Sequence, residues 1–108
     1  MTLVRACDKS EVSVGRLKFV QVAGKDLVIV NLDGKFYAMD NWCTHEQGNL
    51  SDGELEKNVL TCPEHEAKFD VKTGKVVMGP DGTSPDTVTS ERAYKIVIQG
   101  NDLMVEIS

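Results

Sequence analysis

The chain has 108 residues, which is enough for one domain and too few for two. With 41% hydrophobic and 27% charged residues, it is too apolar for a disordered chain and ordinary for a folded one. Its 17 acidic residues outnumber 12 basic ones, and the net charge of -5 argues against nucleic acid or an anionic membrane as a partner. The acidic surface favours either a basic protein partner or solubility alone.

The N-terminus carries no recognisable targeting signal. Residues 1–8 lack the apolar core of a signal peptide, and no stretch approaches the roughly 20 apolar residues of a membrane span. We therefore expect a cytoplasmic protein without membrane contact. In such a chain the odd number of cysteines, three, argues against a disulfide framework and favours thiolate chemistry or metal binding.

Short segments rich in Val, Ile, Leu and aromatic residues recur about every ten residues between turn residues, which is typical of an all-β domain. The first predicted strand contains Cys7, which we interpret as a buried structural thiol. Asp8–Glu11 allows one helical turn with Asp8 as its cap. Leu17–Val22 is a predicted strand whose alternation breaks at Phe19–Val20, which predicts a bulge.

Two hairpins follow from the pattern. Asp26–Leu32 is almost continuously apolar, as in a strand covered on both faces, and Asp33–Gly34 predicts a type I′ turn into Lys35–Met39. Residues 94–107 alternate apolar and polar side chains on both sides of a Gly100–Asn101 turn. Together these segments predict a small antiparallel β-sandwich or barrel.

Residues 41–85 differ from the rest of the chain. They hold both histidines and eight of the 12 glycines and prolines. A domain of this size rarely uses so many turn residues in one segment without a functional reason. We predict a loop-rich insert here, between the two hairpins.

Four residues in this insert form a ligand pattern: Cys43, His45, Cys62 and His65. The two cysteines are 19 residues apart and the two histidines 20, so two loops each present one thiolate and one imidazole. Such a pair of loops suits a binuclear centre with two chemically different ends. In a Rieske [2Fe-2S] centre, two histidines replace two cysteines on one of the two irons.

This C-x-H and C-x-x-H pattern, with sixteen residues between its halves, resembles the Rieske motif. The chain resembles a small Rieske-type ferredoxin over nearly its full length, with further matches at Leu50-Ser51-Asp52-Gly53, Cys62-Pro63, Phe69-Asp70, Thr73-Gly74 and Gly79-Pro80. The resemblance implies a single Rieske domain over residues 1–108, with one [2Fe-2S] cluster bound within residues 41–85.

The resemblance also implies roles for single residues. Cys43 and Cys62 would hold the inner iron, and His45 and His65 would hold the outer iron near solvent. The loop around Pro80 would close over the cluster as a third flap. The flap region, residues 78–88, is longer and more polar than is usual in the family.

The loops lack features of the high-potential Rieske proteins. Those proteins carry an extra cysteine in each loop, where this chain has Gly48 or its neighbours and Glu64, and a serine hydroxyl near the cluster, where it has Glu66 and Ala67. Fewer donors to sulfur, together with the carboxylates of Glu46, Glu64 and Glu66, disfavour the reduced cluster. We expect a potential toward the low end of the Rieske range of about −150 to +300 mV.

Glu66 departs from the family pattern, because glycine commonly follows the second histidine. If the backbone needs a positive φ at this position, a residue other than glycine costs roughly 1–2 kcal/mol.

The resemblance implies one-electron transfer. With both histidines on the cluster, none is left for a catalytic triad or for the mononuclear iron site of an oxygenase, and the chain lacks G-x-G-x-x-G and P-loop motifs. Such ferredoxins carry electrons from a flavin-containing ferredoxin reductase to a terminal oxygenase, often one that hydroxylates aromatic rings. We expect a monomer that is not an enzyme, with His45 and His65 as the exposed electron port and with transient docking of partners.

Two other functions fit the same residues. One is an accessory Rieske-type subunit of a larger enzyme such as a nitrite reductase. The other is a zinc-stabilised interaction module, because Cys₂His₂ is also a zinc ligand set.

The neighbouring side chains have alternative interpretations as well. Trp42 is either part of the core, which we favour, or an apolar shield for the cluster. Phe69 is predicted to lie in the core beneath the second loop. The carboxylates are predicted to form a solvated face, with partner docking as the alternative, at Glu46, Glu54, Glu56, Glu64 and Glu66.

Overall fold

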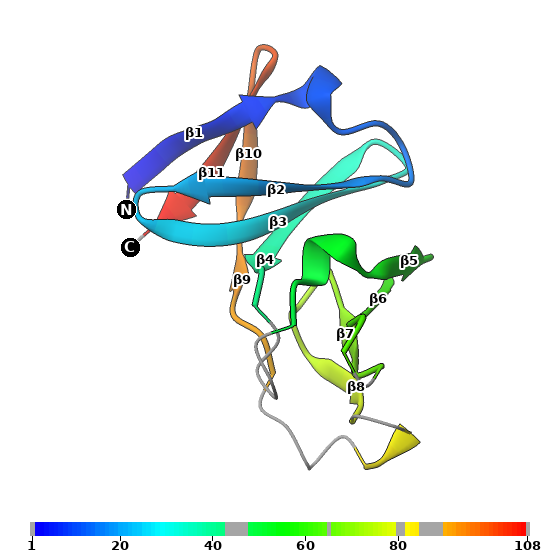
Figure 1. Cartoon of the computed structure of the whole chain (residues 1–108). Helices are drawn as coiled ribbons and strands as arrows, with labels where there is room; N and C mark the ends of the chain where they lie inside the picture. The colour runs from blue at the N-terminus through cyan, green and yellow to red at the C-terminus, as the bar shows by residue number, and fades with distance from the viewer. Residues whose placement is uncertain (1, 43–47, 65, 80–81, 85–89, 108) are drawn as a thin grey trace.

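The strands form three antiparallel sheets in a computed structural model, which describes residues 2–42, 48–64, 66–79, 82–84 and 90–107 (Figure 1). The elements are β1 (Thr2–Asp8), η1 (Lys9–Glu11), β2 (Leu17–Val22), β3 (Lys25–Leu32), β4 (Lys35–Asp40), η2 (Leu50–Asp52), β5 (Glu54–Glu56), β6 (Val59–Thr61), β7 (Lys68–Asp70), β8 (Val76–Met78), β9 (Ala93–Tyr94), β10 (Ile96–Gln99) and β11 (Asp102–Ile107). The predicted all-β fold is confirmed.

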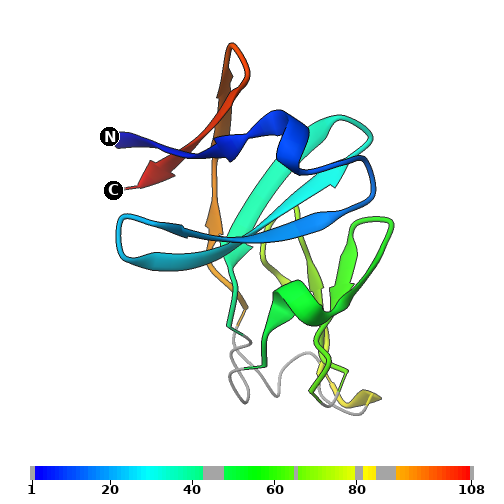
Figure 2. The same ribbon diagram turned by 45° about the horizontal axis from the view of Figure 1, so that its top comes forward.

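The sheets have the strand orders β1-β11-β10, β2-β3-β4-β9 and β5-β6-β7-β8. Figure 1 shows the first two sheets together and the third as a separate lobe below β3 and β4. In Figure 2 the first and last strands lie side by side, so the two chain ends are neighbours. The small lobe is inserted between β4 and β9, which pair with each other, as the prediction of an insert requires.

Strand β3 contributes to both hydrophobic cores. Leu27 and Ile29 belong to the core between the two larger sheets, whereas Val28 and Val30 belong to the core shared with the small lobe. All four side chains are fully buried. The continuous apolar run predicted a strand covered on both faces, and this alternation between two cores is the reason for it.

The predicted hairpin turns are confirmed. Asp33 and Gly34 have φ values of 52° and 90°, the two positive angles of a type I′ turn, between the paired residues Leu32 and Lys35. In the C-terminal hairpin Gly100 has φ of 63°, and the strands pair in register on both sides of it.

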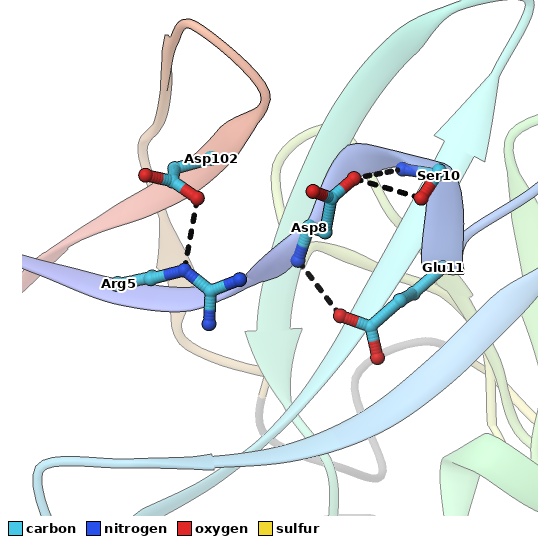
Figure 3. A network of polar contacts seen from close by, with 5 residues as sticks. All are labelled: Arg5, Asp8, Ser10, Glu11 and Asp102. Atoms are coloured by element: carbon cyan, nitrogen blue, oxygen red, sulfur yellow. Dashed lines mark hydrogen bonds and ion pairs between the residues drawn. The ribbon is translucent and has the colours of Figure 1, made fainter.

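Figure 3 shows the polar contacts that hold the first strand and the short helix after it. The Asp8 carboxylate accepts a hydrogen bond from the Ser10 backbone N–H at 2.9 Å, which lowers the pKa of Asp8, and the Asp8 N–H donates to Glu11 at 2.8 Å. This capping box confirms the predicted cap. Arg5 donates to Asp102 at 2.9 Å across β1 and β11, and that hydrogen bond raises the pKa of Arg5.

The predicted bulge at Phe19–Val20 is wrong. Strands β2 and β3 pair in step from Leu17 opposite Val30 to Val22 opposite Lys25. Phe19 simply points away from the core. Its apolar side chain packs edge-on against Trp42, with ring centroids 6.5 Å apart, which explains why the alternation looked broken.

The insert contains more regular structure than its sequence predicts. Strands β5 to β8 form a four-stranded sheet within residues 41–85, and η2 precedes it. Each of these strands has only three residues, which is too short for an alternating pattern to show.

Tyr94 fixes the short strand β9 against β4. Its hydroxyl donates to Asp40 Oδ1 at 2.8 Å, and burial, followed by this hydrogen bond, raises the pKa of Tyr94 to about 12. In the unfolded chain a tyrosine ionises near pH 10. The contribution of Tyr94 to the free energy of unfolding is therefore fully present below about pH 10 and is lost as the pH rises toward 12.

We therefore expect the free energy of unfolding to fall by about 1–2 kcal/mol over this interval, as measured by urea denaturation. The decrease should be smaller in Tyr94→Phe. A variant with the same pH profile as the parent protein would contradict this assignment.

Among the described residues there is no helix with the length and hydrophobicity needed to cross a membrane.

Candidate metal centre

The first ligand loop, which is predicted to present Cys43 and His45, is closed at its base by backbone pairing. Trp42 and Asn49 form an isolated antiparallel bridge, and the Leu50 N–H donates to the Asn41 carbonyl at 2.9 Å. Cys43 and His45 lie between these ends, outside the described residues. The structure therefore brings the two ends of the loop together directly after β4.

Side-chain amides reinforce this closure. Asn41 is fully buried, and its Nδ2 donates to Asn49 Oδ1 at 2.8 Å. The same Asn49 oxygen accepts from the Ser51 N–H at 3.1 Å and caps η2. Neither asparagine is among the predicted site residues. Asn49 was detectable as an N-cap before Leu-Ser-Asp, whereas nothing in the sequence marks Asn41.

The second ligand loop is short and tightly closed. The Cys62 N–H donates to the Ala67 carbonyl at 2.7 Å, so the two ends of this loop are joined directly. Cys62 itself is fully buried, beside Phe69 and Leu60 in the core of the small lobe. His65 lies outside the described residues. The prediction that Phe69 lies in the core beneath this loop is confirmed.

The two loops meet at Gly48 and Cys62. A Cβ atom added to Gly48 would lie 2.5 Å from Cys62 Sγ and 3.1 Å from Glu64 Cβ. Gly48 is therefore the point where the first loop touches the thiol of the second, and only glycine leaves room for that sulfur. Gly48 and Glu64 thus lie close together, and the resemblance implies that the extra cysteines of high-potential Rieske proteins correspond to Gly48, or its neighbours, and Glu64.

Glu66 has a φ of 59°, so the backbone does take the left-handed conformation at this position, where glycine is common in the family. We expect Glu66→Gly to raise the free energy of unfolding by about 1 kcal/mol, because the loss of left-handed strain outweighs the greater freedom of glycine in the unfolded chain. Urea denaturation of the iron-loaded protein measures this. Glu64→Gly is the control, since Glu64 has no positive φ, and it should destabilise. A destabilised Glu66→Gly would contradict the explanation.

The preferred interpretation of Trp42 as a core residue is wrong, because its side chain is 43% exposed. The indole N–H donates to Asp26 Oδ2 at 2.8 Å, and this hydrogen bond is the main cause of a lowered pKa at Asp26. Gln21 donates to the other oxygen of Asp26 at 3.0 Å. Trp42 is thus held in a defined position at the surface, at the start of the first ligand loop.

The third loop begins beside β8. The Gly79 N–H donates to the Thr83 carbonyl at 3.0 Å, and Val77 and Met78 are exposed just before Gly79. Pro80 and residues 85–88 lie outside the described residues. The chain rejoins the lobe where the Ser90 hydroxyl accepts from the Val76 N–H at 3.0 Å.

The other predicted residues lie either in the core or at the surface. Cys7 is buried in the core between the larger sheets, as predicted, and burial raises the pKa of its thiol. Neither Cys7 nor Cys62, the two cysteines in the described ranges, forms a disulfide. The carboxylates of Glu54, Glu56, Glu64 and Glu66 are exposed, as a solvated face requires, and Glu46 lies outside the described residues.

The described residues fit a [2Fe-2S] cluster. A buried thiol with its sulfur against a glycine of the other loop is the arrangement that an inner-iron ligand needs, since thiolates are the preferred ligands of such clusters. The turn at Glu66 redirects the chain directly after His65. The bases of the two loops therefore face one another, and the Cys62 sulfur is the one predicted ligand atom within the described residues.

Comparison with known proteins agrees with this site. The Rieske [2Fe-2S] domain family matches residues 2–95. The ferredoxin component of the naphthalene 1,2-dioxygenase system of Pseudomonas aeruginosa is 35% identical over 98 residues, covering 91% of this chain and 88% of that protein. The Sphingomonas yanoikuyae B1 ferredoxin superimposes with a TM-score of 0.87 at 26% identity, covering 99% of this chain and 100% of that one.

A chain in a complex of reduced oxygenase and oxidized ferredoxin in carbazole 1,9a-dioxygenase is also similar. Its TM-score is 0.83 at 26% identity, with 95% of this chain and 91% of that chain covered. This chain belongs to the Rieske [2Fe-2S] domain family. It carries one [2Fe-2S] cluster and serves as an electron-transfer component rather than as a catalytic subunit.

Proposed function

We propose that this protein carries single electrons from a flavin-containing ferredoxin reductase to a terminal oxygenase that hydroxylates aromatic rings. The observation that carries the proposal is the contact between the two ligand loops, where the buried Cys62 sulfur faces Gly48. The names of its relatives, which are ferredoxin components of naphthalene and biphenyl dioxygenase systems, support an aromatic substrate for the oxygenase partner.

In this proposal, Cys43 and Cys62 hold the inner iron and His45 and His65 hold the outer iron, within a single domain whose cluster-binding part is residues 41–85. The bound cluster supplies a site that accepts and releases one electron. The chain supplies its surroundings. The core residues Leu60 and Phe69 exclude water behind Cys62, and the loop closures at Asn41 and Ala67 fix the spacing of the ligands.

Partners dock transiently at the histidine end in this proposal, and the protein acts as a cytoplasmic monomer. A shuttle needs interfaces that form and dissociate with each electron, so small contacts suit it better than a permanent complex. The exposed Trp42, Val77 and Met78 border the ligand loops and offer apolar contact area there.

The proposal is tested by absorbance and electron paramagnetic resonance spectra before and after dithionite, with iron and zinc measured on the same sample. We expect about two irons per chain and, on reduction, the rhombic signal of low average g that histidine ligation produces. A colourless protein with one zinc would overturn the electron carrier. Stable co-purification with a large enzyme, at full iron content, would instead favour an accessory subunit.

We expect a reduction potential below zero. Glu64 and Glu66 flank His65 and are exposed, so their negative charges disfavour the electron that the reduced cluster gains. Replacing either carboxylate with glutamine should raise the potential by about 20 mV, as measured by redox titration. A potential well above zero in the parent protein would contradict this expectation.

A further inference from the structure

A groove lined by lysines runs beside β4, on a protein that is acidic overall. It consists of two adjacent cavities of about 410 and 370 Å³. Tyr37 and Lys72 line both cavities, so the two adjoin at these side chains. Lys35 and Lys57 line the first cavity and Lys95 lines the second. We call this feature the lysine groove.

The charge of the lysine groove is opposite to that of the whole chain. Four of the 12 basic residues line it, and among the lining residues that the structure describes Asp33 is the one carboxylate. Within the described ranges, none of these four lysines forms an ion pair with a carboxylate. Like charges held close together repel one another, and an anionic ligand relieves that repulsion.

The backbone beside the groove is suited to an extended ligand. β4 pairs with β9 only at Ala38 and Met39, so along residues 35–37 this edge has no strand partner among the described residues. The Asp40 N–H donates to the Arg92 carbonyl at the same edge. Because every second residue of a strand turns its backbone groups to one edge, the backbone groups of Phe36 face this edge too. An added strand can use those groups while its alternate side chains reach the lysines.

The composition of the groove favours carboxylates over a single phosphate. Its positive charges are spread along two cavities, whereas a phosphate site gathers its donors around one point. Its described lining residues include no arginine, the residue whose planar fork binds phosphate in two places. Several carboxylates along a chain match this layout better.

The groove also lies apart from the cluster ligands. Asn58 lines the first cavity, and the three-residue strand β6 separates it from Cys62, a span of about 13 Å in extended chain. Figure 1 shows the turn between β5 and β6 at the far end of the small lobe from the start of the second ligand loop. An occupant of the groove therefore leaves the histidine end accessible.

We propose that the lysine groove binds an extended, carboxylate-rich segment of a protein partner. Such a segment tethers the partner and raises the effective concentration of its docking surface at the ligand loops. This role goes beyond electron transfer itself, and it does not depend on which oxygenase the protein serves.

The test is fluorescence anisotropy of a dye-labelled hexaglutamate peptide with the iron-loaded protein at low salt. The variant Lys57→Gln/Lys72→Gln removes two groove charges. The control Lys9→Gln/Lys25→Gln makes the same change in net charge at lysines outside the groove. We expect the groove variant to bind the peptide about fivefold more weakly, or worse, and the control to stay within about twofold of the parent.

Three outcomes would overturn the proposal: no binding of the peptide by the parent protein, equal weakening in the groove variant and the control, or displacement of the peptide by inorganic tripolyphosphate at much lower concentration than by unlabelled peptide. The last would make the groove a phosphate site. Because the assay measures binding alone, its failure leaves the electron carrier intact, and the iron content of each variant shows that the cluster is retained.

Discussion

Gly48→Ala should abolish cluster binding while leaving a folded chain. The added methyl would lie 2.5 Å from Cys62 Sγ, a separation that real side chains do not tolerate, so the thiol must turn away from the site or the first loop must move. Either movement displaces a proposed ligand of a centre whose geometry is fixed by its metal–ligand bonds. We expect iron content to fall at least about tenfold, with loss of the reduced rhombic signal.

The matched control is Gly100→Ala. The methyl added to Gly100 meets no heavy atom within 4 Å, but its φ of 63° makes any side chain strained. This variant should lose roughly 1 kcal/mol of stability and keep its full iron content. A Gly48→Ala protein with undiminished iron would show that the two loops do not meet around the cluster as the contact with Cys62 implies.

The two described cysteines should respond in opposite ways to the same substitution. Cys62→Ala removes a proposed ligand and should give a colourless protein, because three ligands cannot complete a four-ligand cluster site. Cys7→Ala should keep the colour, the iron and the signal. Both thiols are buried, at 0% and 3% exposure, so the substitutions cost similar packing energy, about 1–2 kcal/mol.

The measurement is iron per chain together with the urea midpoint of each variant. If both variants lose similar packing energy but only Cys62→Ala loses its iron, Cys62 is a ligand and Cys7 is a core residue. If Cys7→Ala also lost its iron, the cluster would have to depend on the core between the two larger sheets. Full iron in Cys62→Ala would remove that residue from the proposed ligand set.

Much of the fold could be predicted because its long strands carry complete patterns. The eight residues of β3 are long enough to show burial on both faces, and Asp33–Gly34 has the backbone preferences of a single turn type. Strands β5 to β8 could not be predicted, because three residues cannot show a period of two. Their pairing depends on the core around Phe69, which is a property of the folded lobe.

The candidate site was only partly predictable. The spacing of cysteines and histidines predicts the ligand set and the cluster. All four ligand assignments remain a prediction, and three of these residues, Cys43, His45 and His65, lie outside the described residues. The tight contact at Gly48 could not be read from the sequence, since a glycine needed for space looks like any loop glycine. Trp42 was misassigned because a hydrogen bond to Asp26 and an edge contact with Phe19 hold an aromatic side chain at the surface.

The sharing of β3 between two cores couples the unfolding of one core to that of the other. Leu27 and Ile29 face one core, and Val28 and Val30 face the other, so neither core can come apart without disturbing the strand that completes its neighbour. The ligand-bearing lobe is therefore not a module that could be cut out at residues 41–85 and remain folded. Opening of either half should propagate through the whole domain as one cooperative event, and amide hydrogens along β3 should be among the last to exchange with solvent.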